Sequence, residues 1–373
     1  MKGRILLVLS LLLVSCSQEG LSSQSSRNTI HLPSFGEPIQ IHSQLQQDYL
    51  DFYFDSTYDA LAHPEVDGSH ELSHPDVLTL SWNDDEQHDS YSFLLSQDRL
   101  LSNARIIETQ TKSISLTNLE IGKKYYYQVK SGDITSDLGE FTIAADGPRN
   151  LFIDGITNVR DIGGWKLADG KISRQGLLLR GGRLNASYKA GYESKHIEPE
   201  EVIPEITAEG IKEFKKLGIK TEVDFRTNDR NGYPEGVSPY CVVDGVDYVS
   251  LPMNGNASIS DNGESVKAFM DLLCDESKYP FYIHCNIGTD RTGMVCYLLN
   301  ALLGADEKTL YQDYLFSNFG KIEGTRSASN KYNTYFGLVD YSGKTLMDKA
   351  ISYFESIGIS KADCQKIQNK FWE

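Results

Sequence analysis

The sequence predicts a multidomain protein in which an N-terminal all-β unit precedes an α/β unit with a central, mostly parallel sheet flanked by helices. Two observations support this order. Short strand-like runs separated by turn residues occupy residues 72–147, whereas from residue 148 onward apolar strands alternate with helical patterns. The chain has 373 residues, enough for two domains, and its 40% hydrophobic content supports real cores.

The first residues predict an export signal. A short basic start precedes an apolar run from Ile5 to Val14, which is too short for an ordinary transmembrane helix. The run ends in Leu-Val-Ser-Cys at Cys16, which resembles a bacterial lipobox, so residues 1–15 would be removed and Cys16 lipidated. The acyl chains would anchor the protein to a membrane of the bacterial cell envelope, on either the periplasmic or the cell-surface face. A plain secretory signal is the alternative.

Residues 16–71 are interpreted as a Ser- and Gln-rich tether followed by a segment without a clear pattern. Residues 72–147 are rich in short strand-like runs, at 77–82, 91–95, 113–116, 125–129 and 139–143. Leu119, Gly122 and Tyr125 are spaced like the corner motif of fibronectin type III domains, and Trp82 is typical of the core tryptophan of that fold. The resemblance implies a fibronectin type III-like β-sandwich. We expect it to act as a spacer, with partner binding as the alternative.

Residues 148–373 follow a linker and show the α/β pattern. Strands are predicted over residues 177–179, 222–225 and 281–283. Thr207 is the expected N-cap of a helix over 208–217, and Ser360 is the expected N-cap of the last helix. A buried helix is predicted over 294–303, ending at Gly304.

One stretch, His284-Cys285-Asn286-Ile287-Gly288-Thr289-Asp290-Arg291-Thr292-Gly293, lies between a predicted buried strand and this buried helix. Backbone N–H groups of such a loop, together with the helix N-terminus, can surround a tetrahedral dianion. Arg291 would bind two phosphate oxygens and favour the thiolate of Cys285. The thiolate could then attack phosphorus and form a cysteinyl-phosphate, with Thr292 assisting departure of the sulfur. The candidate phosphate-binding residues are Asn286, Ile287, Gly288, Thr289, Asp290 and Arg291.

The stretch matches the signature His-Cys-x-x-Gly-x-x-Arg-Thr-Gly of cysteine-dependent phosphatases. With Asp290 before the arginine, it resembles the atypical bacterial tyrosine phosphatases, some of which act on phosphoinositides. Residues 158–164, 176–180, 217–227 and 313–318 are also similar to motifs of that group, so the resemblance covers approximately residue 151 to the C-terminus. Two positions depart from the pattern: Thr289 stands where the group usually has Lys, and Arg230 replaces an expected Glu.

The resemblance implies a tyrosine or dual-specificity phosphatase. A carboxylic acid must protonate the leaving oxygen. We prefer Asp290, where the resembled family has an acidic role proposed, and Asp261 is the alternative because other tyrosine phosphatases use an upstream Asp on a mobile loop. His284 is expected to support the cysteine, and Asp224 to orient Arg226 or the loop. The arginines of the matching motifs that could line the pocket are Arg160, Arg180, Arg183 and Arg226.

Composition excludes some partners. The net charge of −16 and the pI near 5.0 argue against nucleic-acid binding. The six cysteines show no metal-ligand spacing, and a thiolate mechanism needs neither metal nor cofactor. The expected substrate is a phosphorylated protein or a small phosphomonoester. The alternatives are a phytase-like or phosphoinositide phosphatase and a surface protein that binds a phospho-ligand without turnover. The simplest alternative is that Cys285 is a structural residue in a turn.

Overall fold

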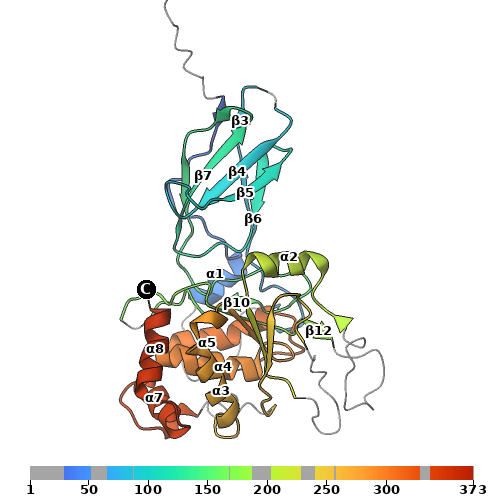
Figure 1. Ribbon diagram of the computed structural model, residues 1–373. Helices are drawn as coiled ribbons and strands as arrows, with labels where there is room; N and C mark the ends of the chain where they lie inside the picture. Colours follow the sequence, from blue (N-terminus) through green and yellow to red (C-terminus); the bar gives the residue numbers. More distant parts are fainter. Residues whose placement is uncertain are drawn as a thin grey trace, which may run out of the picture.

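The computed structural model describes residues 29–51, 65–86, 88–167, 169–186, 203–227, 240–255, 258–327 and 337–372. The predicted signal peptide, the tether, Cys16 and Arg230 lie outside the described residues. Figure 1 shows an all-β unit above a larger α/β unit, with helices α1 (Gln44–Asp51) and α2 (Ala208–Lys216) near the junction. No helix within the described ranges is long and apolar enough to span a membrane.

The α/β unit is built on a mostly parallel sheet, as predicted. Within the described residues its strand order is β10 (Arg160–Asp161), β11 (Leu178–Gly181), β16 (Phe281–His284), β14 (Thr221–Asp224) and β15 (Asp247–Ser250). Only β10 runs antiparallel to its neighbour in this sheet. The central strand β16 ends at His284, level with Gly181 and Asp224 on the two adjacent strands. The carboxyl ends of three parallel strands therefore meet next to Cys285.

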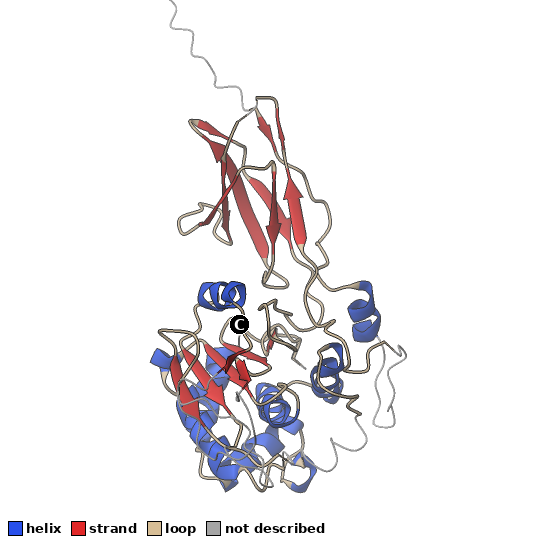
Figure 2. Ribbon diagram, turned by 90° about the vertical axis from the view of Figure 1, so that its right-hand side faces the viewer, coloured by secondary structure: helices blue, strands red, loops and turns tan. Residues whose placement is uncertain are grey.

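Helices flank both faces of this sheet (Figure 2). Phe281 and Ile283 of β16 pack in one core cluster with residues of most of the helices, whereas Tyr282 packs on the opposite face with Phe214 of α2. The helices of the first cluster are α3 (Gly263–Leu273), α4 (Asp290–Leu303), α5 (Glu307–Leu315), α7 (Leu346–Ser356) and α8 (Lys361–Phe371). Every residue of α4 from Arg291 to Leu303 is buried, so the helix that begins after the Cys285 loop is enclosed by protein.

The helix ends follow the sequence signals. The Thr207 hydroxyl accepts a hydrogen bond from Gly210 N at the start of α2, and Ser360 accepts one from Asp363 N at the start of α8, so both predicted N-caps are confirmed. Gly304 ends α4 in the left-handed conformation, with φ of +92°. Short elements complete the unit: β12 (Asn185–Ala186), β13 (Ile203–Pro204) and the 3₁₀ helices η2 (Glu276–Lys278), η3 (Phe316–Phe319) and η5 (Leu338–Asp340).

The all-β unit contains a β2–β6 pair and a sheet of order β5-β4-β7-β8, with β9 also paired to β7. The strands are β2 (Leu78–Ser81), β4 (Tyr91–Ser96), β5 (Arg105–Thr109), β6 (Ser113–Leu116), β7 (Lys124–Ser131), β8 (Ile134–Thr135) and β9 (Gly139–Thr142). Trp82 and Tyr125 lie in their shared core, and the Tyr125 hydroxyl accepts a hydrogen bond from Glu120 N at 2.8 Å. The fibronectin type III-like assignment stays a prediction.

The segment ahead of β2 contributes to both units. β1 (Ile30–His31) pairs with β3 (Asn83–Asp84) of the all-β unit. Tyr49 of α1 instead lies in the main core of the α/β unit, where its hydroxyl donates to Gln312 O at 2.9 Å and its ring packs edge-on against Phe316. The chain therefore contacts the α/β unit before it forms most of the all-β unit.

The two units are joined by buried hydrogen bonds. The Gln175 amide accepts from Ile121 N at 3.0 Å and donates to Ile121 O at 2.9 Å. Arg149 donates to Leu119 O at 3.2 Å on one side and to Asp161 Oδ2 at 3.2 Å on the other. Because these side chains are buried and each makes two hydrogen bonds, they hold the two units in one relative orientation.

Candidate active site

The predicted loop runs from the end of β16 to the start of α4. Cys285 directly follows His284, and Thr289 is the N-cap residue of α4. Gly288 adopts φ of +69°, and a Cβ atom there would lie 2.2 Å from the carbonyl oxygen of Gly181. Only glycine fits this position, because any side chain would collide with the backbone of β11.

The carbonyl groups of the loop are all held from the outside. Cys285 O is bonded to His284 Nδ1 at 2.9 Å, Asn286 O accepts from Arg183 N at 3.1 Å, and Ile287 O accepts from Asn158 Nδ2 at 3.1 Å. Gly288 O accepts from the Arg180 guanidinium at 2.7 Å. Because a trans peptide points its N–H opposite to its C=O, the N–H groups of residues 286–289 point to the other side of the loop. None of these N–H groups donates to another described residue, so they form a nest for an anion.

The surroundings of the Cys285 thiol favour its ionised form. Its side chain is buried, and burial alone would raise its pKa, but the Arg291 guanidinium and, after it, the neighbouring Thr292 hold the pKa below the ordinary value. Burial raises the pKa of the other four described cysteine thiols, to about 12 for Cys296 and about 11 for Cys364. Among the described cysteines, the thiolate is therefore favoured only at Cys285.

Two buried carboxylates lie behind the loop, against His284. Burial would lower the pKa of His284, yet the Asp224 and Glu222 carboxylates raise it. Its Nε2 lies 2.7 Å from Glu222 Oε1, and its Nδ1 lies 2.9 Å from Cys285 O. An imidazolium donates through both nitrogens and thereby fixes the first carbonyl of the loop. Glu222 was not predicted as a site residue, because nothing local in the sequence sets it apart from other charged residues.

Asp224 and Arg226 form a fully buried ion pair. The Arg226 guanidinium binds both carboxylate oxygens at 2.7 to 3.0 Å and also donates to Asn185 Oδ1 at 2.8 Å. Burial would raise the pKa of Asp224, but Arg226 and His284 hold it at about 2. Arg226 has no exposed surface, so the structure places it as support for the end of β14 rather than as a lining of an open pocket.

Arg160 and Arg180 are also buried and share Asp313. Arg180 donates to Asp313 Oδ2 at 2.7 Å, and Arg160 donates to Asp313 Oδ1 at 3.0 Å. Arg160 further donates to Asn158 Oδ1, and the Asn158 amide donates to the loop. Three stretches that resemble family motifs thus meet behind the loop and hold its carbonyl groups, and neither arginine is exposed to a substrate.

The remaining loop side chains differ in exposure. Thr289 is buried, and its hydroxyl donates to Ile287 O at 3.3 Å while accepting from Asn158 Nδ2 at 3.3 Å. The residue that replaces the usual Lys therefore supports the loop itself. Arg183 is partly exposed and donates to both Asn286 Oδ1 and Glu205, which places it at the rim.

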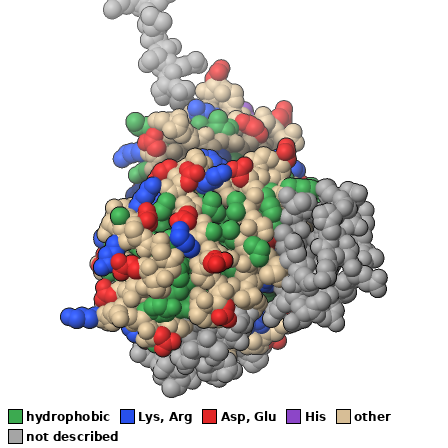
Figure 3. Space-filling view, turned by 60° about the horizontal axis from the view of Figure 1, so that its bottom comes forward, with side chains coloured by type: hydrophobic (Ala, Val, Ile, Leu, Met, Phe, Trp, Pro, Cys, Tyr) green, Lys and Arg blue, Asp and Glu red, His purple; other side chains and the backbone are tan. Residues whose placement is uncertain are grey.

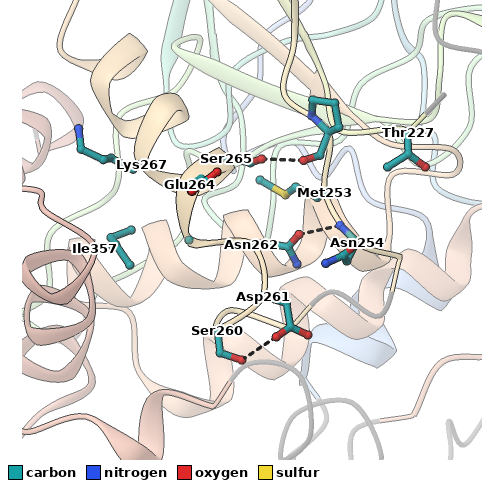
Figure 4. Close-up of a pocket in the computed structure, with 12 residues that line it drawn as sticks. Thr227, Met253, Asn254, Ser260, Asp261, Asn262, Glu264, Ser265, Lys267 and Ile357 are labelled. Carbon is teal, nitrogen blue, oxygen red and sulfur yellow. Dashed lines mark hydrogen bonds between the residues drawn. The ribbon is translucent and has the colours of Figure 1, made fainter. Parts of the chain in front are cut away.

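The two acid candidates lie in different surroundings. Asp290 begins α4 and binds Arg326 through both carboxylate oxygens at 3.2 Å, a partner that the sequence did not predict. Asp261 is exposed on the loop between β15 and α3 and accepts a hydrogen bond from Ser260 at 3.4 Å. It lines a cavity of about 600 Å³ together with Thr227, Met253 and Lys267 (Figure 4).

This cavity adjoins the catalytic loop. Met253 N donates to Phe225 O at 3.1 Å, and Arg291 donates to the same carbonyl oxygen at 3.4 Å. Met253, which lines the cavity with Asp261, and Arg291 of the loop thus share one hydrogen-bond acceptor. Among the described residues, no group of His, Cys, Asp and Glu side chains is arranged to hold a metal ion.

A family model described as the tyrosine phosphatase family matches residues 151–195 and 201–373. No curated protein matches the sequence. Among solved structures, P. aeruginosa TpbA in complex with pTyr is 19% identical, with 43% of this chain and 79% of that chain covered and a TM-score of 0.28. The core catalytic domain of the PP-IP phosphatase SIW14 from S. cerevisiae, in complex with citrate, is 16% identical, with 35% and 76% covered and a TM-score of 0.26. With TM-scores this low, these structures add no argument to the family match.

Proposed function

We propose, from the premise that this chain belongs to the tyrosine phosphatase family and is a protein-tyrosine-phosphatase-type hydrolase, that it dephosphorylates phosphorylated proteins. The substrate residue would be phosphotyrosine, alone or with phosphoserine and phosphothreonine. The observation that carries this proposal is the loop itself. Four carbonyl groups are held outward, the matching N–H groups point inward, and a thiolate is stabilised beside Arg291.

The geometry supports a two-step reaction. The Cys285 thiolate attacks phosphorus while the bond to the ester oxygen breaks, and that oxygen takes a proton from an acid. The loop N–H groups and the Arg291 guanidinium stabilise the charge on the three remaining oxygens. Water then hydrolyses the cysteinyl-phosphate, and the sulfur leaves as a thiolate, stabilised by Arg291 and Thr292, the groups that lower the pKa of Cys285.

The nucleophile is tested by turnover of p-nitrophenyl phosphate. Cys285→Ser should abolish turnover, because a serine hydroxyl is not ionised near neutral pH, whereas Cys364→Ser on α8 should retain it. Cys285→Ser should still bind a phosphotyrosine peptide. A Cys285→Ser enzyme as active as the parent would refute the thiolate mechanism, and a parent that binds the peptide without turnover would support the binding-protein alternative.

The adjoining cavity favours substrates with a single phosphate group. Its charged lining residues are two carboxylates, Asp261 and Glu264, and one ammonium, Lys267, which is paired with Asp271 at 2.8 Å. A polyanionic inositol phosphate would be repelled there. We expect kcat/KM to be higher for a phosphotyrosine peptide than for inositol hexakisphosphate. The reverse ranking would favour the phytase-like alternative.

The proton donor is tested by leaving-group dependence. Replacing the donor should slow phenyl phosphate, whose phenolate is a poor leaving group, more than p-nitrophenyl phosphate. We propose Asp290 as the donor, so Asp290→Asn should show this selective loss and Asp261→Asn should not. The opposite pattern would transfer the role to Asp261, which lines the open cavity.

We also propose that the protein is exported and lipid-anchored through Cys16. The first described strand, β1, pairs with β3 at the end of the all-β unit that lies far from the α/β unit (Figure 1). An anchor ahead of β1 would therefore leave the all-β unit, which we propose to be fibronectin type III-like, as a spacer. Incorporation of a labelled fatty acid, lost in Cys16→Ser together with membrane association, tests the anchor.

The charges on the face drawn in Figure 3 give no support to a nucleic-acid partner. The face of the α/β unit shown in Figure 3 carries acidic and basic side chains mixed with hydrophobic ones, with no continuous basic patch among the coloured residues. Together with the net charge of −16, this supports a protein or small phosphomonoester substrate.

A further inference from the structure

Arg326 lies on the segment after η3 and reaches back to the catalytic loop. Its Nε donates to Asp290 Oδ1 and its terminal nitrogen donates to Asp290 Oδ2, each at 3.2 Å, which is the two-bond arrangement of an arginine–carboxylate pair. Both side chains are largely buried, with 17% and 21% of their surfaces exposed. The Tyr314 hydroxyl also donates to Asp290 Oδ1, at 3.4 Å.

The electrostatic field links Arg326 to the nucleophile. Burial would lower the pKa of Arg326, but Asp290, Tyr314 and, more weakly, Cys285 raise it. Within the part of the chain that the structure describes, the groups that face the Asp290 carboxylate include the Arg326 guanidinium and the Cys285 thiolate, with Tyr314 as a hydroxyl donor. Because Arg326 contacts Asp290 directly and Cys285 is its weakest partner, removing the Arg326 charge acts mainly on the proposed acid.

The backbone around Arg326 is held by residues that precede the all-β unit. Asn318 binds both Arg326 N, at 2.7 Å, and Arg326 O, at 2.9 Å. Gly68 N in turn donates to Asn318 O at 3.0 Å, and Thr325 Oγ1 donates to Asp67 O at 3.0 Å. We call residues 65–73 the strap, because their backbone also bonds to Ile322 and Phe319 on the same segment.

We propose that Arg326 is a positioning residue that holds Asp290 in place for the reaction, and that the strap keeps Arg326 there. This inference rests on the proposed function. Under this proposal, residues 65–73 contribute to the geometry of the active site, although the family match begins only at residue 151.

The test compares pH profiles of kcat/KM for an aryl phosphate. Arg326→Met should lower kcat/KM by about 10- to 100-fold, the cost of a misplaced catalytic group. It should also move the falling limb of the profile to higher pH, because the lost cation no longer favours ionised Asp290. Arg326→Lys retains the positive charge, so the falling limb of its pH profile should lie at nearly the same pH as in the parent protein. In an Asp290→Asn background, Arg326→Met should have less than a twofold effect.

The inference would be overturned if Arg326→Met left the pH profile of kcat/KM unchanged. It would also be overturned if Arg326→Met lowered kcat/KM equally in the parent and in the Asp290→Asn background. Turnover by the parent and its absence in Cys285→Ser are measured in the same series, so failure of the proposed function is recognised separately.

The strap is tested at Gly68. A Cβ at this position would lie 2.8 Å from Ile322 and 2.9 Å from Gly324 O, so Gly68→Ala displaces the segment that carries Arg326. Gly170→Ala is the matched control, since Gly170 has φ of +84°, close to the +79° of Gly68, and no neighbouring atom within 4 Å. We expect Gly68→Ala, and to a smaller extent Thr325→Val, to move the pH profile as Arg326→Met does. If Gly68→Ala and Thr325→Val both gave the same pH profile as Gly170→Ala, the proposed role of the strap would be refuted.

Discussion

The Arg180 guanidinium, which has no exposed surface, donates a 2.7 Å hydrogen bond to the carbonyl oxygen of Gly288. This contact sets the direction of the peptide group between Gly288 and Thr289, and so aims the Thr289 N–H into the loop. The same guanidinium is paired with Asp313, which also binds Arg160. The anion site therefore depends on charges that never touch the substrate.

Arg180→Met tests the stabilising part of this role. Because it leaves the buried Asp313 with one cation fewer, we expect the free energy of unfolding to fall by about 3–5 kcal/mol. Urea unfolding at neutral pH measures the change. Lys124→Met is the control: it breaks the Lys124–Glu140 pair, whose side chains are about half exposed, and should cost less than about 1 kcal/mol. Equal losses in the two variants would contradict the assignment.

The depressed pKa of Cys285 predicts the pH dependence of its alkylation. Inactivation by iodoacetate should reach half its maximal rate below the pH typical of a free thiol, because Arg291 and Thr292 favour the thiolate. Arg291→Met should move this midpoint to higher pH, since the main cationic contribution is lost. Cys364→Ser should leave the midpoint unchanged. A midpoint that Arg291→Met does not move would show that another group sets the pKa.

Gly288→Ala separates the steric requirement of the loop from ordinary backbone strain. The new Cβ would collide with Gly181 O, so we expect turnover to be lost. Gly218→Ala has the same φ of +69° but no atom within 4 Å, and it should cost only about 1 kcal/mol of stability while activity is retained. Comparable activities of the two variants would rule out the collision as the reason for glycine.

The buried Asp224–Arg226 pair predicts loss of stability in acid. The pKa of Asp224 is lowered from 3.8 to about 2 in the folded protein, so its contribution is complete above about pH 4 and is lost as the pH falls toward 2. The shift corresponds to about 2 kcal/mol. The difference in unfolding free energy between the parent and Asp224→Asn should therefore shrink between pH 5 and pH 3. A constant difference over that interval would contradict the lowered pKa.

Local signals in the sequence predicted the central features of the α/β unit. The caps at Thr207 and Ser360, the end of α4 at Gly304 and the strand before Cys285 were all correct, because caps and burial patterns depend on residues a few positions apart. Strand β5 was missed because its residues are mostly exposed and lack strong alternation.

The contacts that complete the site could not be predicted from local sequence signals. Glu222 and His284 are 62 positions apart, Asp290 and Arg326 are 36 apart, and Tyr49 and Gln312 are 263 apart. No local pattern distinguishes Arg326 or Glu222 from an ordinary surface charge. Only the sheet order and the path of the strap bring these side chains to the loop.

The sequence alone located the loop that carries Cys285, Gly288 and Arg291, because a loop between a buried strand and a buried helix constrains its residues over a few positions. The tertiary structure decided which arginines bind the loop rather than a substrate, which carboxylates lie behind the cysteine, and which guanidinium meets Asp290. The physical reason is burial: a charge enclosed by protein must find its partner wherever the fold places one, however far away it lies along the chain.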